Sequence, residues 1–231
     1  MNDMGNAGLK LSFIIPALNE APYIRSCLEP LQRFRDDGHE VILVDGGSND
    51  ATVEQARPLV DEVIRSTRGR ARQMNAGARV ATGDVFLFIH ADTVMHMASA
   101  DPLVENIRFP RAWGRFDVRL SGSQFLLRVI EFFMNLRSRL TGIATGDQVI
   151  FITRSLFLES GGFPDIPIME DVAFSSMLAR LCRPLCLRAT VVTSSRRWEQ
   201  HGILRTILKM WYLRLSYFFG ADPEQLARRY G

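Results

Sequence analysis

LSFIIPALNE, at positions 11–20, joins a short apolar run to a polar turn, and the pattern returns in EVILVDGGSND at 40–50 and in DVFLFIHAD at 84–92. Short runs rich in Val, Ile and Phe that are bounded by turn residues are typical of buried strands. Apolar residues at helical spacing connect these runs at 23–34, 51–60 and 72–81. This alternation predicts an α/β fold, with a Rossmann-like, mostly parallel sheet flanked by helices over about the first 100 residues.

The second half of the chain has a different pattern. AWGRFDVRL at 112–120 and GDQVIFIT at 146–153 predict strands, whereas residues 124–140 and 168–181 predict amphipathic helices. No Gly/Ser-rich linker divides the chain, so we expect a single domain over residues 1–231. It would comprise an N-terminal half at 1–100, a second half at 101–200 and a C-terminal helical appendage at 201–231.

The composition limits the partners and the compartment. With 47% hydrophobic and 23% charged residues the chain can bury a full core, and a net charge of +3 is too small to indicate a nucleic-acid partner. Three cysteines without a CxxC pair, and a start without the pattern of a signal peptide, predict a reducing, cytoplasmic setting. Cys182 and Cys186 are expected to be small core residues, with a zinc site as the alternative.

Polar residues follow three of the predicted strands, at PALNE (16–20), DGGSND (45–50) and HAD (90–92). Ligands of open α/β sheets bind beyond the carboxyl ends of the strands, so these residues are the first candidates for a site. Asn19, Ser48 and Asp92 could instead cap helices or build turns. The Rossmann dinucleotide and P-loop fingerprints are both absent from the sequence. A carboxylate at a strand end, such as Asp92, is a ligand that Mg2+ and Mn2+ favour.

Six segments, taken together and in order, resemble the motifs of family 2 glycosyltransferases of the GT-A fold: PALNE, DGGSND, RARQMNAG (70–77), HAD, GGF (161–163) and the pair Glu170 and Asp171. The resemblance covers residues 11 to 198. HAD, GDQ (146–148), MED (169–171) and RRW (196–198) are similar to a subgroup of short bacterial members. The resemblance implies a GT-A fold with C-terminal amphipathic helices. It also implies an enzyme that moves a sugar from a nucleotide diphosphate sugar to an acceptor hydroxyl.

The resemblance places the nucleotide sugar in the N-terminal half. The donor-binding residues that it implies are Pro16, Ala17, Asn19, Glu20, Asp45, Gly47, Arg70, Arg72, His90, Ala91 and Asp92. Gly46 follows Asp45 where the family usually has a second aspartate, so one carboxylate contact to the nucleotide is missing and the identity of the nucleotide base stays open. A UDP-sugar is the donor we expect. Arg70 and Arg72 would contact phosphate or, alternatively, lie on a solvated helix face.

The Asp-x-Asp metal motif of the family is replaced here by His90, Ala91 and Asp92. The resemblance implies Mg2+ or Mn2+ as the cofactor, with Asp92 as a ligand. His90 would ligate the ion through neutral imidazole, or contact the ribose or the diphosphate. Because one negative charge is missing, we expect a weaker metal site. A structural role for His90 at the strand end, and a metal site built from His90, Asp92 and His96, are the alternatives.

An inverting transfer needs a carboxylate that takes the proton of the attacking hydroxyl. Asp171 resembles this base, and Glu170 would hold the helix start or touch the acceptor. Without the resemblance, an acidic pair at a helix N-terminus is typical of a cap. The acceptor-side residues implied are Glu170, Asp147, Gln148, Arg196, Arg197 and Trp198.

The segment RRW resembles the arginine-tryptophan motif of processive relatives such as cellulose synthases. Ser194 stands where that motif has a glutamine, so processivity does not follow. Arg196 would close over the donor, and Trp198 would lie under the acceptor sugar or, alternatively, fill the core.

Residues 124–140 and 201–220 are apolar but interrupted by Arg and Lys, and their uninterrupted apolar runs are too short to span a bilayer. Basic residues beside Trp211, Tyr212, Tyr217, Phe218 and Phe219 are typical of helices that lie on an anionic membrane, where the acceptor would be a lipid or lipid-linked. Packing on the domain or on a second subunit, as a homo-oligomer, is the alternative. The expected location is the cytoplasm, or the inner face of the cell membrane as a peripheral protein.

Two other classes of function stay open. Gly46 and His90, at positions where the family has aspartates, would suit a catalytically weak sugar-nucleotide-binding or regulatory protein. Against this, Asp92 and Asp171 are the carboxylates that the transfer chemistry needs, and both are present. A nucleotidyltransferase also binds a nucleotide and a metal on such a sheet, but it needs a glycine- and arginine-rich phosphate loop, and PALNE is not one.

Overall fold

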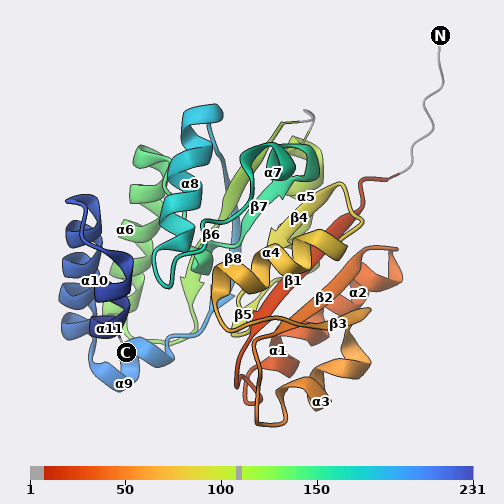
Figure 1. Cartoon of the computed structure of the whole chain (residues 1–231), viewed down its shortest axis with the longest axis horizontal. Helices are drawn as coiled ribbons and strands as arrows, with labels where there is room; N and C mark the ends of the chain where they lie inside the picture. The colour runs from red at the N-terminus through yellow and green to blue at the C-terminus, as the bar shows by residue number, and fades with distance from the viewer. Residues whose placement is uncertain (1–7, 108–110, 231) are drawn as a thin grey trace.

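The computed structural model describes residues 8–107 and 111–230. These residues form one central sheet with the strand order β3-β2-β1-β4-β7-β6-β8-β5, covered by helices on both faces (Figure 1). The α/β fold predicted from the sequence is therefore confirmed. The first seven residues, on which the expectation of no signal peptide rests, lie outside the described part of the chain.

The N-terminal half of the sheet is parallel, as expected. β1 pairs with β2 and β4, and β2 pairs with β3, all in parallel. Residue 17 of β1 is in register with residue 45 of β2, so the PALNE and DGGSND loops leave the sheet side by side. The bounds are β1 (Leu11–Ala17), β2 (Glu40–Asp45), β3 (Glu62–Arg65) and β4 (Val85–Phe88).

Beyond β4 the sheet is mixed. β7 (Ile150–Thr153) runs antiparallel to β4 and to β6 (Trp113–Leu120). β8 (Leu185–Thr193) pairs in parallel with β6 and antiparallel with β5 (Thr93–Val94). The sequence did not predict β8, in which Arg188 interrupts the apolar pattern. Only the second half of GDQVIFIT is a strand, since Thr145 and Gln148 close a capping box around the 3-10 turn η3 (Gly146–Gln148).

Two of the predicted helices are each split by a proline, which lacks the N–H that helix continuation needs. Pro30 divides the segment at 23–34 into α1 (Ile24–Leu28), η1 (Glu29–Leu31) and α2 (Gln32–Asp36). Pro58 ends α3 (Thr52–Ala56) in the 3-10 turn η2 (Arg57–Leu59). The remaining helices are α4 (Arg70–Val80), α5 (Met97–Asn106), α6 (Phe125–Thr141), α7 (Arg154–Ser160), α8 (Glu170–Leu181), α9 (Arg196–His201), α10 (Ile203–Phe218) and α11 (Pro223–Tyr230).

Each face of the sheet has its own hydrophobic core, because successive strand residues point to opposite sides. Phe13 and Ile15 of β1 pack with α1, α2 and α3 on one face. Ile14, between them, packs with α4, α7 and α8 on the other. The C-terminal helices α10 and α11 attach to this body through Leu213 and Leu226, which contact the segment before α8. Within residues 8–107 and 111–230, every helix is either too short or too polar to span a bilayer.

Candidate active site

A cavity of about 590 Å³ lies where the two halves of the chain meet, beyond the carboxyl end of β1. Its walls come from the PALNE and HAD loops, the start of α4, the 3-10 turn η3, the start of α8 and the helices α9 and α10. Among the site residues expected from the sequence, those that line it are Pro16, Ala17, Glu20, Arg70, His90, Ala91, Asp92, Asp147, Glu170, Asp171, Arg196, Arg197 and Trp198.

Three of the expected donor residues lie outside the cavity wall and organise the loops behind it. Asp45 is buried and its Oδ1 accepts a hydrogen bond of 2.9 Å from the Ser48 N–H. Asn19 has a φ of 55° and accepts a bond of 2.9 Å from the Asn49 N–H. Gly47 has a φ of 96°, which glycine adopts without strain. These contacts hold the PALNE and DGGSND loops together.

Arg72 and Gln148 also lie outside the cavity wall. Arg72 Nε pairs with Asp165 Oδ1 at 2.8 Å, and both side chains are about half exposed. The Gln148 side chain is fully buried and donates to Ser138 Oγ at 3.0 Å. Gln148 thereby anchors η3 to α6 beneath the site.

The side chain of Gln73 occupies the space beside Gly46. Its Nε2 donates to the carbonyl oxygens of Ala17 at 2.9 Å and Val44 at 2.8 Å. A Cβ added at Gly46 would lie 3.0 Å from Gln73 Nε2, so a side chain at position 46 would require this amide to shift by a few tenths of an ångström. Gln73 of α4 therefore lies where the side chain of a second aspartate would be.

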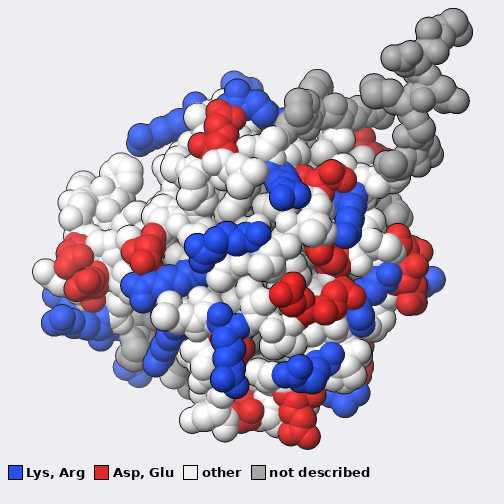
Figure 2. Space-filling model, turned by 45° about the vertical axis from the view of Figure 1, so that its right-hand side comes forward, with Lys and Arg blue, Asp and Glu red and all other residues white. Residues whose placement is uncertain are grey.

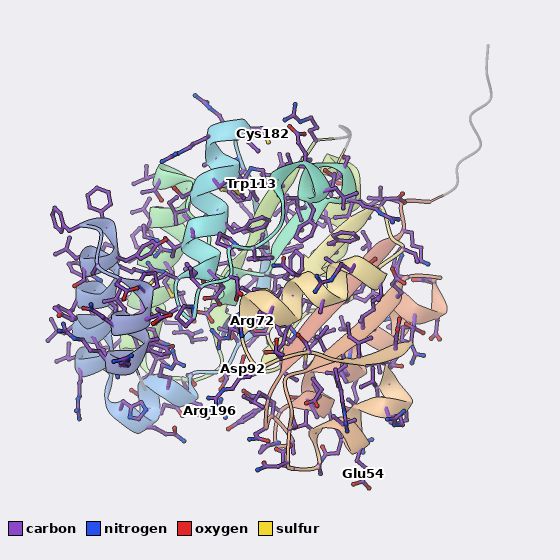
Figure 3. All side chains as sticks on the ribbon, viewed as in Figure 1. Glu54, Arg72, Asp92, Trp113, Cys182 and Arg196 are labelled. Atoms are coloured by element: carbon purple, nitrogen blue, oxygen red, sulfur yellow. The ribbon has the colours of Figure 1, made fainter. Side chains whose placement is uncertain are left out.

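Glu20 and Arg196 form an ion pair in the cavity wall. Arg196 Nη2 is 3.6 Å from Glu20 Oε2, and the Arg196 guanidinium lies 4.5 Å from the centre of the Tyr23 ring. Burial raises the pKa of Glu20; Arg196 opposes this rise, and the charge of Asp92 adds to it. Glu20 Oε2 is buried and has no hydrogen-bond partner. Figure 3 shows Asp92 and Arg196 near each other between the two halves of the molecule.

His90 packs against η3 at Gly146 and Asp147. Its Nδ1 is 3.4 Å from Asp147 Oδ1. A Cβ added at Gly146 would lie 2.2 Å from His90 Nε2, so the ring packs where any side chain at 146 would be. The recessed position of the Asp147 carboxyl raises its pKa, but His90, followed by Arg70 and Arg197, lowers the pKa below its ordinary value. Asp147 therefore places a negative charge beside His90 at neutral pH.

Asp171 is fixed by the backbone of two segments. Its Oδ2 accepts a hydrogen bond from the Gly146 N–H and its Oδ1 one from the Val172 N–H, both at 2.7 Å. Met169, just before the acidic pair, has a φ of 66°, and Val149, just after η3, has a φ of 50°. Positive φ is costly for such residues and is found where the surrounding structure imposes it. The hydrogen bond from Gly146 to Asp171 thus joins η3 to the start of α8.

Glu170 is the other carboxylate of this pair. Burial, and after it the charge of Asp171, raise the pKa of Glu170 to about 7, while Arg70 and His90 oppose the rise. The two neighbouring carboxylates therefore differ in environment: Glu170 is buried, whereas Asp171 is partly exposed to the cavity.

Arginines surround these carboxylates. Burial, followed by the charge of Arg70, lowers the pKa of Arg197, whose guanidinium lies 4.6 Å from the centre of the Tyr230 ring. Figure 2 shows Lys and Arg side chains across the middle of the face toward the viewer, with Asp and Glu beside them. Lining residues that the sequence did not predict as site residues include Arg68, Thr145, His201, Thr206, Arg214 and Tyr230. The basic character of Arg68 was visible in the sequence, but no motif marked the others.

The described residues contain no cluster of three or more His, Cys, Asp or Glu side chains that could hold a metal ion. Cys182 and Cys186 are free and half-buried, and the carbonyl of Cys182 accepts a hydrogen bond of 3.0 Å from Trp113 Nε1 (Figure 3). A zinc site at these cysteines and a protein-built site with His96 are therefore not supported. A cation held mainly by Asp92 would take its other ligands from substrate and water, as Mg2+ commonly does.

A sheet of this order, with carboxylates and arginines from both halves around one cavity beyond its strand ends, defines an α/β protein of the GT-A fold class. The model of the family "Glycosyl transferase family 2" matches residues 12–159. The chain belongs to this family.

Solved structures and a curated relative agree with this class. TarS from S. aureus (residues 1–349) has a TM-score of 0.66 and 21% identity, over 81% of this chain and 61% of that one; TarS is also solved with UDP-GlcNAc. A mannosyltransferase from Pyrobaculum calidifontis, in complex with GDP-Man and Mn2+, has a TM-score of 0.61 and 22% identity, over 80% and 56%. Such identities establish similarity of fold.

The curated relative is a "PGL/p-HBAD biosynthesis glycosyltransferase" of Mycobacterium bovis, 38% identical over 94 residues. The match covers 38% of this chain and 37% of the relative. The chain therefore spans little more than a third of the length of this protein.

Proposed function

We propose that this protein transfers a sugar from a nucleotide diphosphate donor to an acceptor hydroxyl, with inversion at the anomeric carbon. The observation that supports it best is that Asp92 and Asp171, from opposite halves of the chain, line the same cavity together with arginines. A donor diphosphate needs positive charge, and an attacking hydroxyl needs a base across the sugar from it.

The donor would lie along the N-terminal wall. Pro16, Ala17 and Glu20 line this wall, and Arg70 lines it from the start of α4. Arg196 and Arg197 would bind the diphosphate from the other side. A UDP-sugar is our proposed donor, as in the UDP-GlcNAc complex of TarS. The mannosyltransferase is solved with GDP-Man, so the identity of the nucleotide is tested below.

The donor set suits a hard divalent cation. Asp92 and Glu20 are neighbouring carboxylates, whose mutual repulsion a cation would relieve. The Oε2 of Glu20 has an ion pair with Arg196 at 3.6 Å but no hydrogen bond. We propose that Asp92 holds Mg2+ or Mn2+, with His90 beside it; a bound ion would neutralise charge on the leaving diphosphate. The carboxylate of Asp147 holds the His90 ring in place, as carboxylates commonly do for metal-site histidines.

Asp171 is the proposed base. Its two backbone hydrogen bonds leave further lone pairs on the carboxylate for a hydroxyl proton. The acceptor oxygen would form its bond to the anomeric carbon as the bond to the diphosphate oxygen breaks, and the proton would pass to Asp171. No covalent intermediate on the protein is required. Trp198 and Asp147 line the acceptor side of the cavity.

The test begins with thermal-shift measurements against UDP-, GDP- and dTDP-sugars, with and without Mn2+ or Mg2+. We expect one donor to raise the melting temperature in a metal-dependent way, and this shift to shrink in Asp92→Ala. A shift of equal size in that variant would remove Asp92 from the metal site.

Turnover of the best donor tests the base. We expect Asp171→Asn to keep donor binding and to lose roughly a hundredfold or more in kcat. Full turnover in this variant would exclude Asp171 as the base. Donor binding without turnover in the unmodified chain, across a panel of acceptors, would favour a sugar-nucleotide-binding protein over an enzyme.

A further inference from the structure

Two helices of the second half present large apolar side chains to solvent. On α10 five large apolar residues follow one stripe at helical spacing and are between 59% and 81% exposed, and Tyr212 of the same helix is 50% exposed. On α6 the most exposed ones are between 60% and 78% exposed. We call these residues together the α6–α10 apolar face: Phe125, Phe132, Phe133 and Leu140 on α6, and Leu204, Leu208, Trp211, Leu215 and Phe218 on α10.

The two helices form one surface. They lie side by side at the end of the molecule away from β3 (Figure 1). Ile203 and Ile207 of α10 pack against a cluster that contains Leu127 and Ile130 of α6. Large apolar side chains that gather on one exposed surface mark an interaction site.

The opposite side of α10 belongs to the candidate active site. Thr206, Met210 and Arg214 line the cavity, and the Nε of Arg214 is buried without a hydrogen-bond partner. A helix with its side chains is about 10–12 Å across. Whatever covers the α6–α10 apolar face therefore lies about one helix diameter from the cavity.

The exposed charges of α6 and α10 have one sign. α10 contains Arg205, Lys209 and Arg214 and no Asp or Glu. The single acidic residue of α6, Glu131, is buried and pairs with Arg128 at 2.9 Å. Neither helix therefore exposes a carboxylate, whereas Arg205 and Lys209 are exposed.

We propose that the α6–α10 apolar face docks on the surface of an anionic lipid bilayer, with both helices lying in the plane of the membrane. Interfacial helices insert their apolar side chains about 5–10 Å and place Lys and Arg at the headgroups. Trp211 and Tyr212 are of the residue types enriched at this depth. A second copy of the chain would bring the same cations together, whereas anionic headgroups are complementary to them.

Docking through α10 would place the cavity close to the membrane surface. A bilayer on one side of α10 and the cavity on the other would bring a lipid-borne hydroxyl to Asp171. This consequence rests on the proposed transfer function; the docking itself does not.

The docking is tested by co-sedimentation of the full chain with vesicles of phosphatidylcholine alone and of equal parts phosphatidylcholine and phosphatidylglycerol, without donor. We expect pelleting with the anionic vesicles, weakened by 0.5 M NaCl. The double variant Leu208→Ser/Trp211→Ser should reduce the partition at least about tenfold, because two inserting side chains are lost. Arg205→Glu should reduce it severalfold.

The matched control is Leu158→Ser on α7, which replaces a similarly exposed leucine outside the face and should leave pelleting unchanged. No pelleting of the unmodified chain, or equal pelleting of the double variant, overturns the proposal. A dimer by light scattering that Leu208→Ser/Trp211→Ser converts to a monomer overturns it in favour of a second copy. Asp171→Asn should pellet like the unmodified chain even if it loses turnover, which separates this proposal from the proposed reaction.

Discussion

His90 and Gly46 stand where the family resemblance leads one to expect aspartates, and each has a steric partner elsewhere in the chain. The His90 ring fills the space that a side chain at Gly146 would take, and the Gln73 amide fills the space beside Gly46. Asp147, next to Gly146, faces His90 at 3.4 Å and so restores a carboxylate near the lost one. His90 thus packs against Gly146, and Gly46 against Gln73. We expect a larger residue at either glycine to move the side chain that packs on it.

Glu170 gives a prediction for stability against pH. Burial raises its pKa to about 7 in the folded protein, against an ordinary value of 4.5. The folded state therefore binds this proton more tightly, so the Glu170 contribution to the free energy of unfolding is complete below pH 4.5 and is lost as the pH rises through 7. Glu170→Gln keeps the shape without the charge. We expect its melting temperature, relative to the unmodified chain, to be higher at pH 8 than at pH 5.

Thermal melts between pH 5 and pH 8 measure this difference. Glu54→Gln is the control, since Glu54 is exposed on α3 and lies far from the cavity (Figure 3). A difference between Glu170→Gln and the unmodified chain that does not change with pH would contradict the raised pKa.

The element that most directly links sheet and site is α4. Arg70 at its start lines the cavity, Gln73 holds the carbonyls at the ends of β1 and β2, and Asn75 Nδ2 donates to the Phe163 carbonyl at 2.8 Å. This close approach needs a glycine in the helix. A Cβ at Gly77 would lie 2.4 Å from Ile14 Cγ2 and 2.9 Å from Val44 Cγ2.

We therefore expect Gly77→Ala to destabilise the protein. Alanine is ordinarily better than glycine inside a helix by about 1 kcal/mol, but here the methyl group would push α4 away from two buried strands. Overpacking of this kind costs about 1–3 kcal/mol. Denaturant unfolding measures the change, with Gly8→Ala as the control because a Cβ there meets nothing within 4 Å. A gain in stability for Gly77→Ala would show that the helix can shift freely.

Across the whole molecule, the C-terminal helices complete the cavity that the two halves of the sheet begin. α10 and α11 are held to the body by a small cluster, in which Leu213 and Leu226 contact Ile168 and Met169 just before the acidic pair. Packing of α10 therefore controls both the cavity wall and the orientation of the α6–α10 apolar face.

Leu213→Ala should loosen this attachment. Leu213 is 0% exposed, and the loss of a buried leucine costs about 2–5 kcal/mol. Leu208→Ala, on the same helix but 69% exposed, is the matched control and should change the free energy of unfolding by no more than about 0.5 kcal/mol in the absence of lipid. Chemical denaturation measures both. Equal effects of the two substitutions would mean that α10 is not packed as described.

The sequence by itself determined the α/β order, the parallel N-terminal half of the sheet and the polar loops at its strand ends, because these depend on local periodicity and turn residues. Only the tertiary structure decided that Arg72 pairs with Asp165, that Gln148 is buried beneath the site, and that Arg214 and Tyr230 line the cavity. Each of these depends on a contact between segments far apart in the chain. Local patterns record which face of an element is apolar, but the partner of a polar side chain is set by where the other elements pack.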